Sequence, residues 1–503
     1  MTCILLTIIS GILYSLSFPT VSFWFISFIA LVPFLSALDK AENYWRRFFY
    51  GALWAAIMAG AMGHWLFIAL CQHYGLEWWK AGLFFVTCLL LPLAVIYGFF
   101  SLAYGFFKRD GVFFYSAVIP ALWIAAEFLK ELIPVLIPWG NIAYAVLPFQ
   151  SFVQAADIGG VYGVTFLVVL INGLVFMLIK DIRDKRAAWR RIAGAVCLGA
   201  FVFVGVIGYG QFRTGEIQDL AERSKTAGVT LVQGNFSLED RWSGMGFYRR
   251  VQTYLEMSRE AGRAGAPRII VWPETTLNAS ARLDDEFFKS LMRDIGPAAL
   301  LVSGGLKKLD KEGVYNSAYL ISGNGRLQRY DKHIRLPYAE RAPLVDWLGS
   351  FYTAPDAFVG GRSPQSFDTF LGKIAPSICF EILYPDYIRQ AVYQGAEVLV
   401  NISNDAWFGD SPMPYMHMAG ARMRAIENRR YVLRASSSGI SAIIAPDGRT
   451  IKRSRLFQQE KISGDCRLLS QKTLYTKLGH WVLYAAAAVL FLAGIRQIFD
   501  IER

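Results

Sequence analysis

Long apolar runs separated by short polar turns fill the first 210 residues, and one more run follows at the C-terminus. A helix needs about 20 mostly apolar residues to cross the hydrocarbon core of a bilayer. The runs that approach this length cover residues 4–20, 22–38, 50–70, 82–107, 112–130, 161–179, 192–210 and 480–498. The pattern predicts a membrane domain over 1–210 with seven transmembrane helices. Residues 479–503 are predicted to form an eighth helix and a cytoplasmic tail.

The first apolar run resembles a secretory signal peptide in its length. No convincing small-residue cleavage site follows it, and the second run begins after a single turn. These two features favour a helical hairpin over a cleaved leader.

The segment between the last two apolar runs, residues 211–478, has a different pattern. Short β-rich runs occur at GVTLVQGN, RIIVWPE, ALLVSGGL, NSAYLIS, KIAPSICF, AEVLVNIS, RYVLRASS and SAIIAP. Helix-like stretches at 245–263, 284–295, 384–393 and 415–429 separate several of them. Alternating strands and helices predict an α/β domain, for which two packed sheets flanked by helices are plausible.

Lysine and arginine residues mark alternate loops of the membrane domain. They occur at Arg46 and Arg47, Lys108 and Arg109, the run KDIRDKRAAWRR, and Arg496 and Arg503. The intervening loops carry almost none, so the positive-inside rule places both termini in the cytoplasm. The 211–478 domain is then predicted to be extracytoplasmic, and the basic loops are interpreted as topology signals.

The outward loop 131–160 is apolar and aromatic but is interrupted by prolines. It is too irregular for a spanning helix and is expected at the outer bilayer surface. His64 lies within the third predicted helix, and Glu127, Lys130 and Glu131 lie near the outer end of the fifth. Polar residues at such depths often mark function. The three at the helix end are equally consistent with interfacial anchors.

The composition agrees with a membrane protein: 54% of residues are hydrophobic and 15% aromatic. The net charge of +12 is unevenly distributed and is not interpreted as a nucleic-acid surface. The six cysteines are scattered without metal-ligand spacing or a disulfide framework, so neither a metal nor another cofactor is expected. Cys466 has no catalytic neighbours in sequence and is interpreted as structural.

Three residues of the 211–478 domain form a candidate catalytic set. Glu274 ends one predicted strand in VWPETT, Cys379 ends another in SICFE, and Lys332 lies between them in YDKHIRLP. A thiol needs a base to become a nucleophile, and a developing oxyanion needs a positive partner. The alternative for Cys379 is an inert buried thiol, which is the usual state of a cysteine.

These three motifs, in this order, resemble the nitrilase (carbon–nitrogen hydrolase) superfamily. The opening LVQGN, the YAERAPL after the lysine, the run from SNDAWFG onward and the seven-plus-one helix count resemble its apolipoprotein N-acyltransferase family. The resemblance covers essentially the whole chain. Members of that family often have tyrosine after the nucleophile, whereas this chain has Phe380, which keeps the ring and loses the hydroxyl.

The resemblance implies a fold and a reaction. The fold is a multi-pass α-helical membrane domain plus an α-β-β-α sandwich carrying a Glu274–Lys332–Cys379 triad. The reaction transfers a fatty acyl chain from a membrane phospholipid, through a cysteine thioester, to the diacylglyceryl-cysteine amine of an apolipoprotein. The implied location is the bacterial inner membrane, with the catalytic domain on the periplasmic side. A monomer is expected.

Several further residues are candidates for supporting roles. Glu340 or Glu381 is expected to orient Lys332 and keep it charged; the alternative for each is a solvated surface carboxylate. Trp242 and Trp407 are expected to line the acyl-chain route, and simple packing is the alternative for both.

Two other functions remain open at this point. A membrane-tethered amidase or nitrilase would use the same triad on a small C–N substrate, although one anchor would then suffice. A transporter or receptor should instead show broken helices with polar sites at the membrane midplane, and it would not require the triad.

Overall fold

The computed structural model describes residues 1–133, 135–184, 189–237, 244–262, 266–277, 285–309, 313–337, 339–341 and 358–501. The chain divides into two compact units. The first comprises Met1–Thr214, Ser411–Ala419 and Leu478–Arg503, and the second comprises Gly215–Asp410 and Gly420–Lys477. This division lies close to the predicted domain boundaries, with Ser411–Ala419 as the exception.

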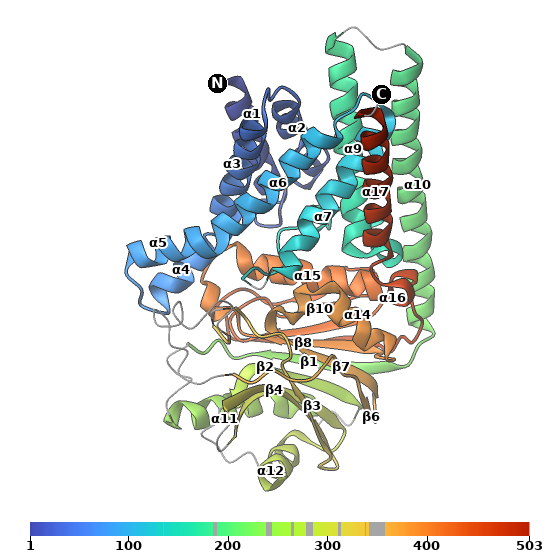
Figure 1. The fold of residues 1–503 in the computed structure, drawn as a ribbon. Coiled ribbons are helices and arrows are strands. Elements are labelled where there is room, and N and C mark those ends of the chain that lie inside the picture. Colours follow the sequence, from blue (N-terminus) through green and yellow to red (C-terminus); the bar gives the residue numbers. More distant parts are fainter. Residues whose placement is uncertain are drawn as a thin grey trace. The chain divides into compact units, whose positions relative to one another are not determined.

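Helices make up almost all of the first unit (Figure 1). They are α1 (Thr2–Leu16), η1 (Trp24–Phe28), α2 (Val32–Asp39), α3 (Tyr44–Gly63), α4 (Trp65–Gln72), α5 (Trp78–Phe85), η2 (Val86–Leu90), α6 (Leu91–Phe107), η3 (Phe114–Val118), α7 (Ile119–Leu132), η4 (Ile142–Tyr144), α8 (Gln150–Val153), α9 (Ala156–Asp184), α10 (Trp189–Glu222) and α17 (Trp481–Ile501). Each predicted apolar run is therefore largely helical, and α10 continues into the second unit.

Not every apolar helix is long enough to cross a bilayer. Among the described residues, four helices have the length and composition of a span: Trp78–Phe107, Ala156–Arg183, Trp189–Glu222 and Trp481–Phe499. The pair α3 and α4, bent by 52° next to His64, would add a fifth. At 1.5 Å per residue the 15 residues of α1 reach only about 22 Å. The seven-plus-one arrangement stays a prediction.

The irregular segment after α7 is packed inside the first unit, where Leu136, Trp139 and Val146 are buried. It is held by two buried charged residues of α7. Glu127 accepts hydrogen bonds from the indole of Trp123, the backbone of Ile142 and the hydroxyl of Thr165. Lys130 Nζ donates to the carbonyl of Trp139 at 3.0 Å. The interpretation of Glu127 and Lys130 as interfacial anchors is wrong, because both are enclosed by this segment.

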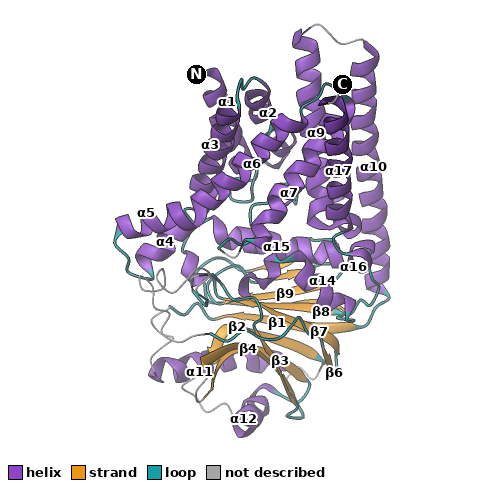
Figure 2. Ribbon diagram, in the orientation of Figure 1, coloured by secondary structure: helices purple, strands orange, loops and turns teal. Residues whose placement is uncertain are grey.

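Two six-stranded sheets form the centre of the second unit (Figure 2). The first has the order β12-β1-β2-β3-β4-β5, with β1 (Thr226–Gln233), β2 (Arg268–Leu277), β3 (Ala299–Leu309), β4 (Gly313–Ser322), β5 (Leu327–Asp331) and β12 (Glu460–Arg467). The second has the order β11-β10-β9-β8-β7-β6, with β6 (Phe367–Thr369), β7 (Gly372–Ile378), β8 (Val398–Ser403), β9 (Tyr431–Ser436), β10 (Ala442–Ile444) and β11 (Thr450–Arg453).

The two sheets pack face to face, with β2 of the first against β8 and β9 of the second. Helices α11 (Gly244–Gly262) and α12 (Asp285–Ile295) cover the outer face of the first sheet, and α14 (Pro385–Tyr393) contacts β7 of the second (Figure 1). Helix α15 (Pro412–Asn428) follows β8, and the short α16 (Leu474–Leu478) follows β12. The central parallel strands are apolar because both of their faces are covered.

Candidate active site

A break in β2 presents Glu274. The ladder between β2 and β3 is interrupted from Trp272 to Leu277, within which Pro273 has no N–H to donate. Thr275 has a φ of 54°, a left-handed conformation that is costly for a β-branched residue. The facing Gly304 makes room, since a Cβ there would lie 2.5 Å from the Glu274 Cα. The bulge turns the carboxylate out of the ladder.

Lys332 follows directly after β5, at the edge of the first sheet. Its backbone N–H donates to the carbonyl of Asn316 in β4 at 2.8 Å, and its own carbonyl accepts from Gly361 at 2.7 Å. The side chain is only 2% exposed. These backbone bonds fix the point from which the ammonium group extends into the interior.

Cys379 follows β7, where the strand turns into a short 3-10 helix, Cys379–Leu383. Its φ of 55° lies in the left-handed region, at a cost of roughly 1–2 kcal/mol for an ordinary residue. The Asn401 amide on the neighbouring strand β8 donates to the Cys379 carbonyl at 3.1 Å. A strained turn at a strand end is a common way to project a nucleophile.

Lys332, Glu274 and Glu340 form one buried cluster, and Cys379 interacts with Lys332 and Glu274 electrostatically. Lys332 Nζ lies 3.4 Å from Glu274 Oε1 and 2.9 Å from Glu340 Oε1. Burial by itself lowers the pKa of Lys332, but the adjacent carboxylates of Glu340 and Glu274 outweigh it and hold the pKa above its ordinary value. The lysine is therefore a fixed cation.

For the Cys379 thiol, the surroundings favour the neutral form instead of the charged one. Burial raises the pKa of Cys379 well above its ordinary value, the negative charge of Glu274 raises it further, and Lys332 opposes both. The free enzyme therefore holds a neutral thiol at physiological pH. Nucleophilic attack requires removal of this proton during the reaction, and Glu274 is the nearby carboxylate that can accept it.

Glu381 connects the cysteine segment to the lysine segment. Its carboxylate accepts backbone hydrogen bonds from Ile378 (2.8 Å), His333 (2.8 Å) and Ile334 (3.0 Å), and a further one from the hydroxyl of Tyr330. Burial raises the pKa of Glu381, and the backbone donors partly offset this. It acts on the backbone on both sides of the site, whereas Glu340 binds Lys332 directly.

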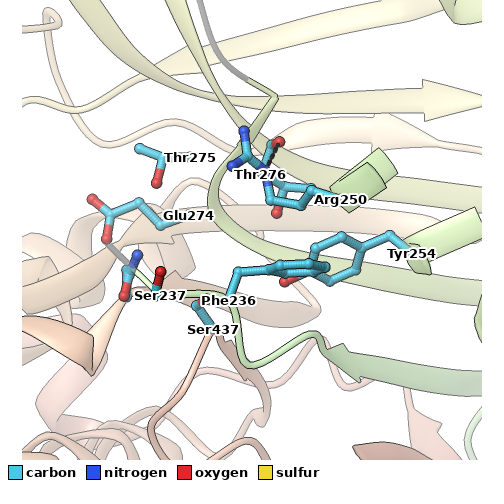
Figure 3. A pocket seen from close by; sticks show the side chains of 9 residues that line it. Phe236, Ser237, Arg250, Tyr254, Glu274, Thr275, Thr276 and Ser437 are labelled. Carbon is cyan, nitrogen blue, oxygen red and sulfur yellow. Dashed lines mark hydrogen bonds between the residues drawn. The ribbon is translucent and has the colours of Figure 1, made fainter. Parts of the chain in front are cut away.

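A pocket opens next to Glu274 on the α11 side of the first sheet (Figure 3). It is lined by Phe236, Ser237, Arg250, Tyr254, Glu274, Thr275, Thr276, Asn404 and Ser437. The aromatic rings of Phe236 and Tyr254 form one side, and the Glu274 carboxylate lies at the other (Figure 3). A substrate group in this pocket would lie against the Glu274 carboxylate.

Comparisons with known proteins match both parts of the chain. Residues 10–174 match the family described as apolipoprotein N-acyltransferase N-terminal domain, and residues 228–470 match carbon-nitrogen hydrolase. A relative named apolipoprotein N-acyltransferase from Allorhizobium ampelinum is 30% identical and aligns with 90% of this chain and 87% of its own length. The chain belongs to the apolipoprotein N-acyltransferase family.

Another relative of the same name, from Geobacter metallireducens, is 29% identical over 98% of this chain and 95% of its own. A solved carbon-nitrogen hydrolase from Helicobacter pylori is 17% identical, covers 48% of this chain and 89% of its own, and gives a TM-score of 0.38. The predicted fold class, a helical membrane domain plus a nitrilase-like α/β domain, is confirmed. The protein is an acyltransferase, and its family and apolar helices indicate a multi-pass membrane protein.

The other residues predicted to support the site lie in several different environments. The ring of Phe380 is buried, and its centroid lies 5.0 Å from Lys332 Nζ, so the ring packs beside the ammonium group. Trp407 lies half-buried in the 3-10 turn Asp405–Phe408 after β8. Trp242 lies outside the described residues. Glu340 and Glu381 are not solvated surface carboxylates, because both are largely buried and hydrogen-bonded.

Sequence reasoning missed a polar network beside Cys379. Arg434 of β9 donates to Asn401 Oδ1 and pairs with Asp405 at 2.7 Å, with both charged side chains fully buried. Ser403 donates to the same Asp405 carboxylate at 2.7 Å. The available signal was a polar residue within an otherwise apolar run, as in VLVNIS and YVLRAS. Within the described residues, no group of three or more His, Cys, Asp or Glu side chains is arranged to hold a metal ion.

Proposed function

We propose that this acyltransferase moves a fatty acyl chain from a membrane phospholipid to the N-terminal amine of a diacylglyceryl-cysteine on an apolipoprotein. The observation that carries the proposal is the buried Glu274–Lys332–Cys379 cluster, with a neutral thiol beside a fixed cation. Relatives that bear the name apolipoprotein N-acyltransferase align along nearly the whole chain.

The first half-reaction would form a thioester. Glu274 takes the thiol proton while the Cys379 sulfur attacks the ester carbonyl carbon of the phospholipid. The resulting oxyanion is stabilised by the Lys332 ammonium and by a backbone N–H near Phe380. When the intermediate collapses, the C–O bond breaks, Glu274 returns the proton to the leaving oxygen, and a lysophospholipid departs.

The second half-reaction would form the amide. An α-amine with a pKa near 7.7–8.0 is partly neutral at physiological pH and attacks the thioester carbonyl. Glu274 accepts a proton from the amine, the C–S bond breaks, and the sulfur leaves and regains the proton. The scheme is ping-pong, since the first product leaves before the second substrate reacts.

The location of the site follows from its substrates. Both lie in a membrane, so we propose that 211–478 is a periplasmic catalytic domain on the inner membrane. Residues 1–210 would supply seven spans and 479–503 the eighth. Trp242 and Trp407 remain candidates for the acyl-chain route, and a monomer contains every proposed catalytic residue.

The decisive assay supplies both substrates to the purified enzyme. A phospholipid with an isotope-labelled acyl chain is incubated with a synthetic diacylglyceryl-cysteine peptide, and the peptide is analysed by mass spectrometry. The proposal predicts a labelled amide on the peptide and one lysophospholipid for each amide. Cys379→Ala should give neither, whereas Cys466→Ala, which alters another buried cysteine, should give both. Ammonia release from small amides without acyl transfer would favour the amidase alternative instead.

A further inference from the structure

Asn316 of β4 lies within the charged cluster. Its side-chain Nδ2 lies 2.7 Å from Glu274 Oε1 and 3.1 Å from Glu340 Oε1. These are the same two oxygens that Lys332 Nζ contacts. The Asn316 carbonyl also accepts the backbone N–H of Lys332. One residue therefore contacts both carboxylates through its side chain and the lysine through its backbone.

The orientation of this amide is dictated by the carboxylates. If the amide were reversed, its oxygen would lie about 3 Å from two carboxylate oxygens, and the contacts would be repulsive. In the observed orientation, none of the described residues donates a hydrogen bond to the buried Oδ1. An unsatisfied buried acceptor costs free energy. An apolar side chain at position 316 of β4 would avoid the cost of the unsatisfied Oδ1. The presence of asparagine there therefore points to a role for its two Nδ2 N–H groups.

The charge balance indicates what that role is. Glu274 and Glu340 bring two negative charges into a buried site, whereas Lys332 supplies one positive charge. Glu340 gains a further donor from the backbone of Leu336, at its Oε2. Glu274 has Asn316 and Lys332, and both contact its Oε1. The other oxygen of Glu274, Oε2, is therefore available to accept a proton, and Glu274 lines the pocket.

We propose that Asn316 is a positioning residue for the base. It fixes Glu274 Oε1 so that Oε2 is presented to the thiol and the substrate. This inference rests on the proposed role of Glu274 as the base that deprotonates Cys379. Among the described residues, the charged and titratable groups that face Glu274 are Lys332, Glu340 and Cys379 in the cluster, and Arg250 and Tyr254 of α11 in the pocket.

The test uses an acyl donor that does not depend on the natural lipid. The full-length enzyme in detergent is mixed with p-nitrophenyl acetate, and the burst of p-nitrophenolate is followed from pH 5 to pH 9. The acetyl group on the Cys379 peptide is confirmed by mass spectrometry. Asn316→Ala should slow the burst about 10–100-fold at pH 7, the loss expected when hydrogen bonds to a charged group are removed.

The pH profile of acylation distinguishes a positioning role of Asn316 from a general loss of structure. Without its donor, the carboxylate takes up a proton more easily, so the acid limb of the acylation rate should move to higher pH in Asn316→Ala. The isosteric Asn316→Asp, which places a third carboxylate in the cluster, should move it further. The matched control is Ser317→Ala, which removes a buried hydroxyl on the other face of β4 that bonds Asp331 instead. Its profile should match the wild type.

Two outcomes would overturn the inference, and they are distinguishable. If Glu274→Gln abolishes the burst but Asn316→Ala and Asn316→Asp keep the wild-type profile, Asn316 does not position the base. If Glu274→Gln gives a normal burst, the base assignment fails, and the inference falls with it.

Discussion

Lys332 keeps its charge at a position where burial alone would favour the neutral amine. Glu340 and Glu274 hold it as a cation, and they also hold it in place before any oxyanion exists. A fixed charge needs no reorganisation when the transition state forms, which is why such groups contribute strongly to catalysis. In the free enzyme the Cys379 thiol is thus neutral, whereas the Lys332 amine is charged.

Replacement of the lysine should therefore damage both catalysis and stability. Lys332→Met leaves Glu274 and Glu340 as buried carboxylates without a cation, a change expected to cost about 3–5 kcal/mol. Thioester formation should fall by at least about 10²–10³-fold, the loss seen for one oxyanion donor. Thermal unfolding and a single-turnover burst measure the two effects. Thioester accumulation at the wild-type rate would contradict the assigned role.

The pKa of Cys379 predicts how its reactivity depends on pH. Because burial and Glu274 raise this pKa, the thiolate fraction should keep increasing from pH 7 to pH 10. Alkylation of Cys379 by iodoacetamide, followed on its peptide by mass spectrometry, should increase over that whole interval. Glu274→Gln removes a charge that raises the pKa and should speed alkylation, although it blocks acyl transfer. A wild-type plateau below pH 8 would indicate a thiolate in the free enzyme.

At the scale of elements, the site is formed by the bulge within β2 and by the ends of β5 and β7, and Glu381 connects the two strand ends. Its carboxylate satisfies backbone N–H groups of Ile378, His333 and Ile334. The strained Cys379 conformation and the Lys332 segment are therefore held by the same side chain. Glu381 therefore contributes to the site mainly by accepting these backbone hydrogen bonds, and less through its charge near Lys332.

Removal of this acceptor should destabilise the second unit. Glu381→Ala leaves the buried N–H of Ile378 and the partly buried N–H groups of His333 and Ile334 without their partner, at about 1–3 kcal/mol each. A fall of about 3 kcal/mol or more in the free energy of unfolding is expected, measured by denaturant titration in detergent. Tyr330→Phe removes one hydroxyl that bonds the same carboxylate and should cost about 1 kcal/mol. Equal effects of the two substitutions would contradict the connecting role.

The sequence was sufficient to predict elements with a strong apolar pattern, but not the more polar edge strands of the two sheets. The eight β-rich runs of 211–478 became strands, and the helices at 245–263 and 284–295 appeared within a few residues of prediction. β5, β6, β11 and β12 were missed because edge strands carry mixed side chains that resemble loops. The triad residues were predicted from their motifs, and their catalytic roles stay a prediction. Asn316 was missed, because only the folded ladder places it beside Glu274.

At the scale of the whole molecule, the proposed substrates require the 211–478 domain to be outside the cytoplasm. The basic loops predict this orientation. Alkaline phosphatase, which is active only after export, should be active when fused near residue 300. The same reporter fused after Arg186, within KDIRDKRAAWRR, should be inactive. The reverse pattern would place the thiol on the wrong side for exported lipoproteins, and the acyltransfer to them would have to be abandoned.

The central claim, an acyl chain held on Cys379, is tested most directly by the mass of the intact protein. Enzyme purified from membranes, or exposed to phospholipid without an acceptor, should carry one added fatty-acyl mass that hydroxylamine removes. Cys379→Ala should remain folded without that mass, and Cys379→Ser should be nearly as poor an acceptor because its hydroxyl is much less acidic. An acyl mass that persists in Cys379→Ala, or a wild-type enzyme that transfers acyl chains without ever carrying one, would contradict the account.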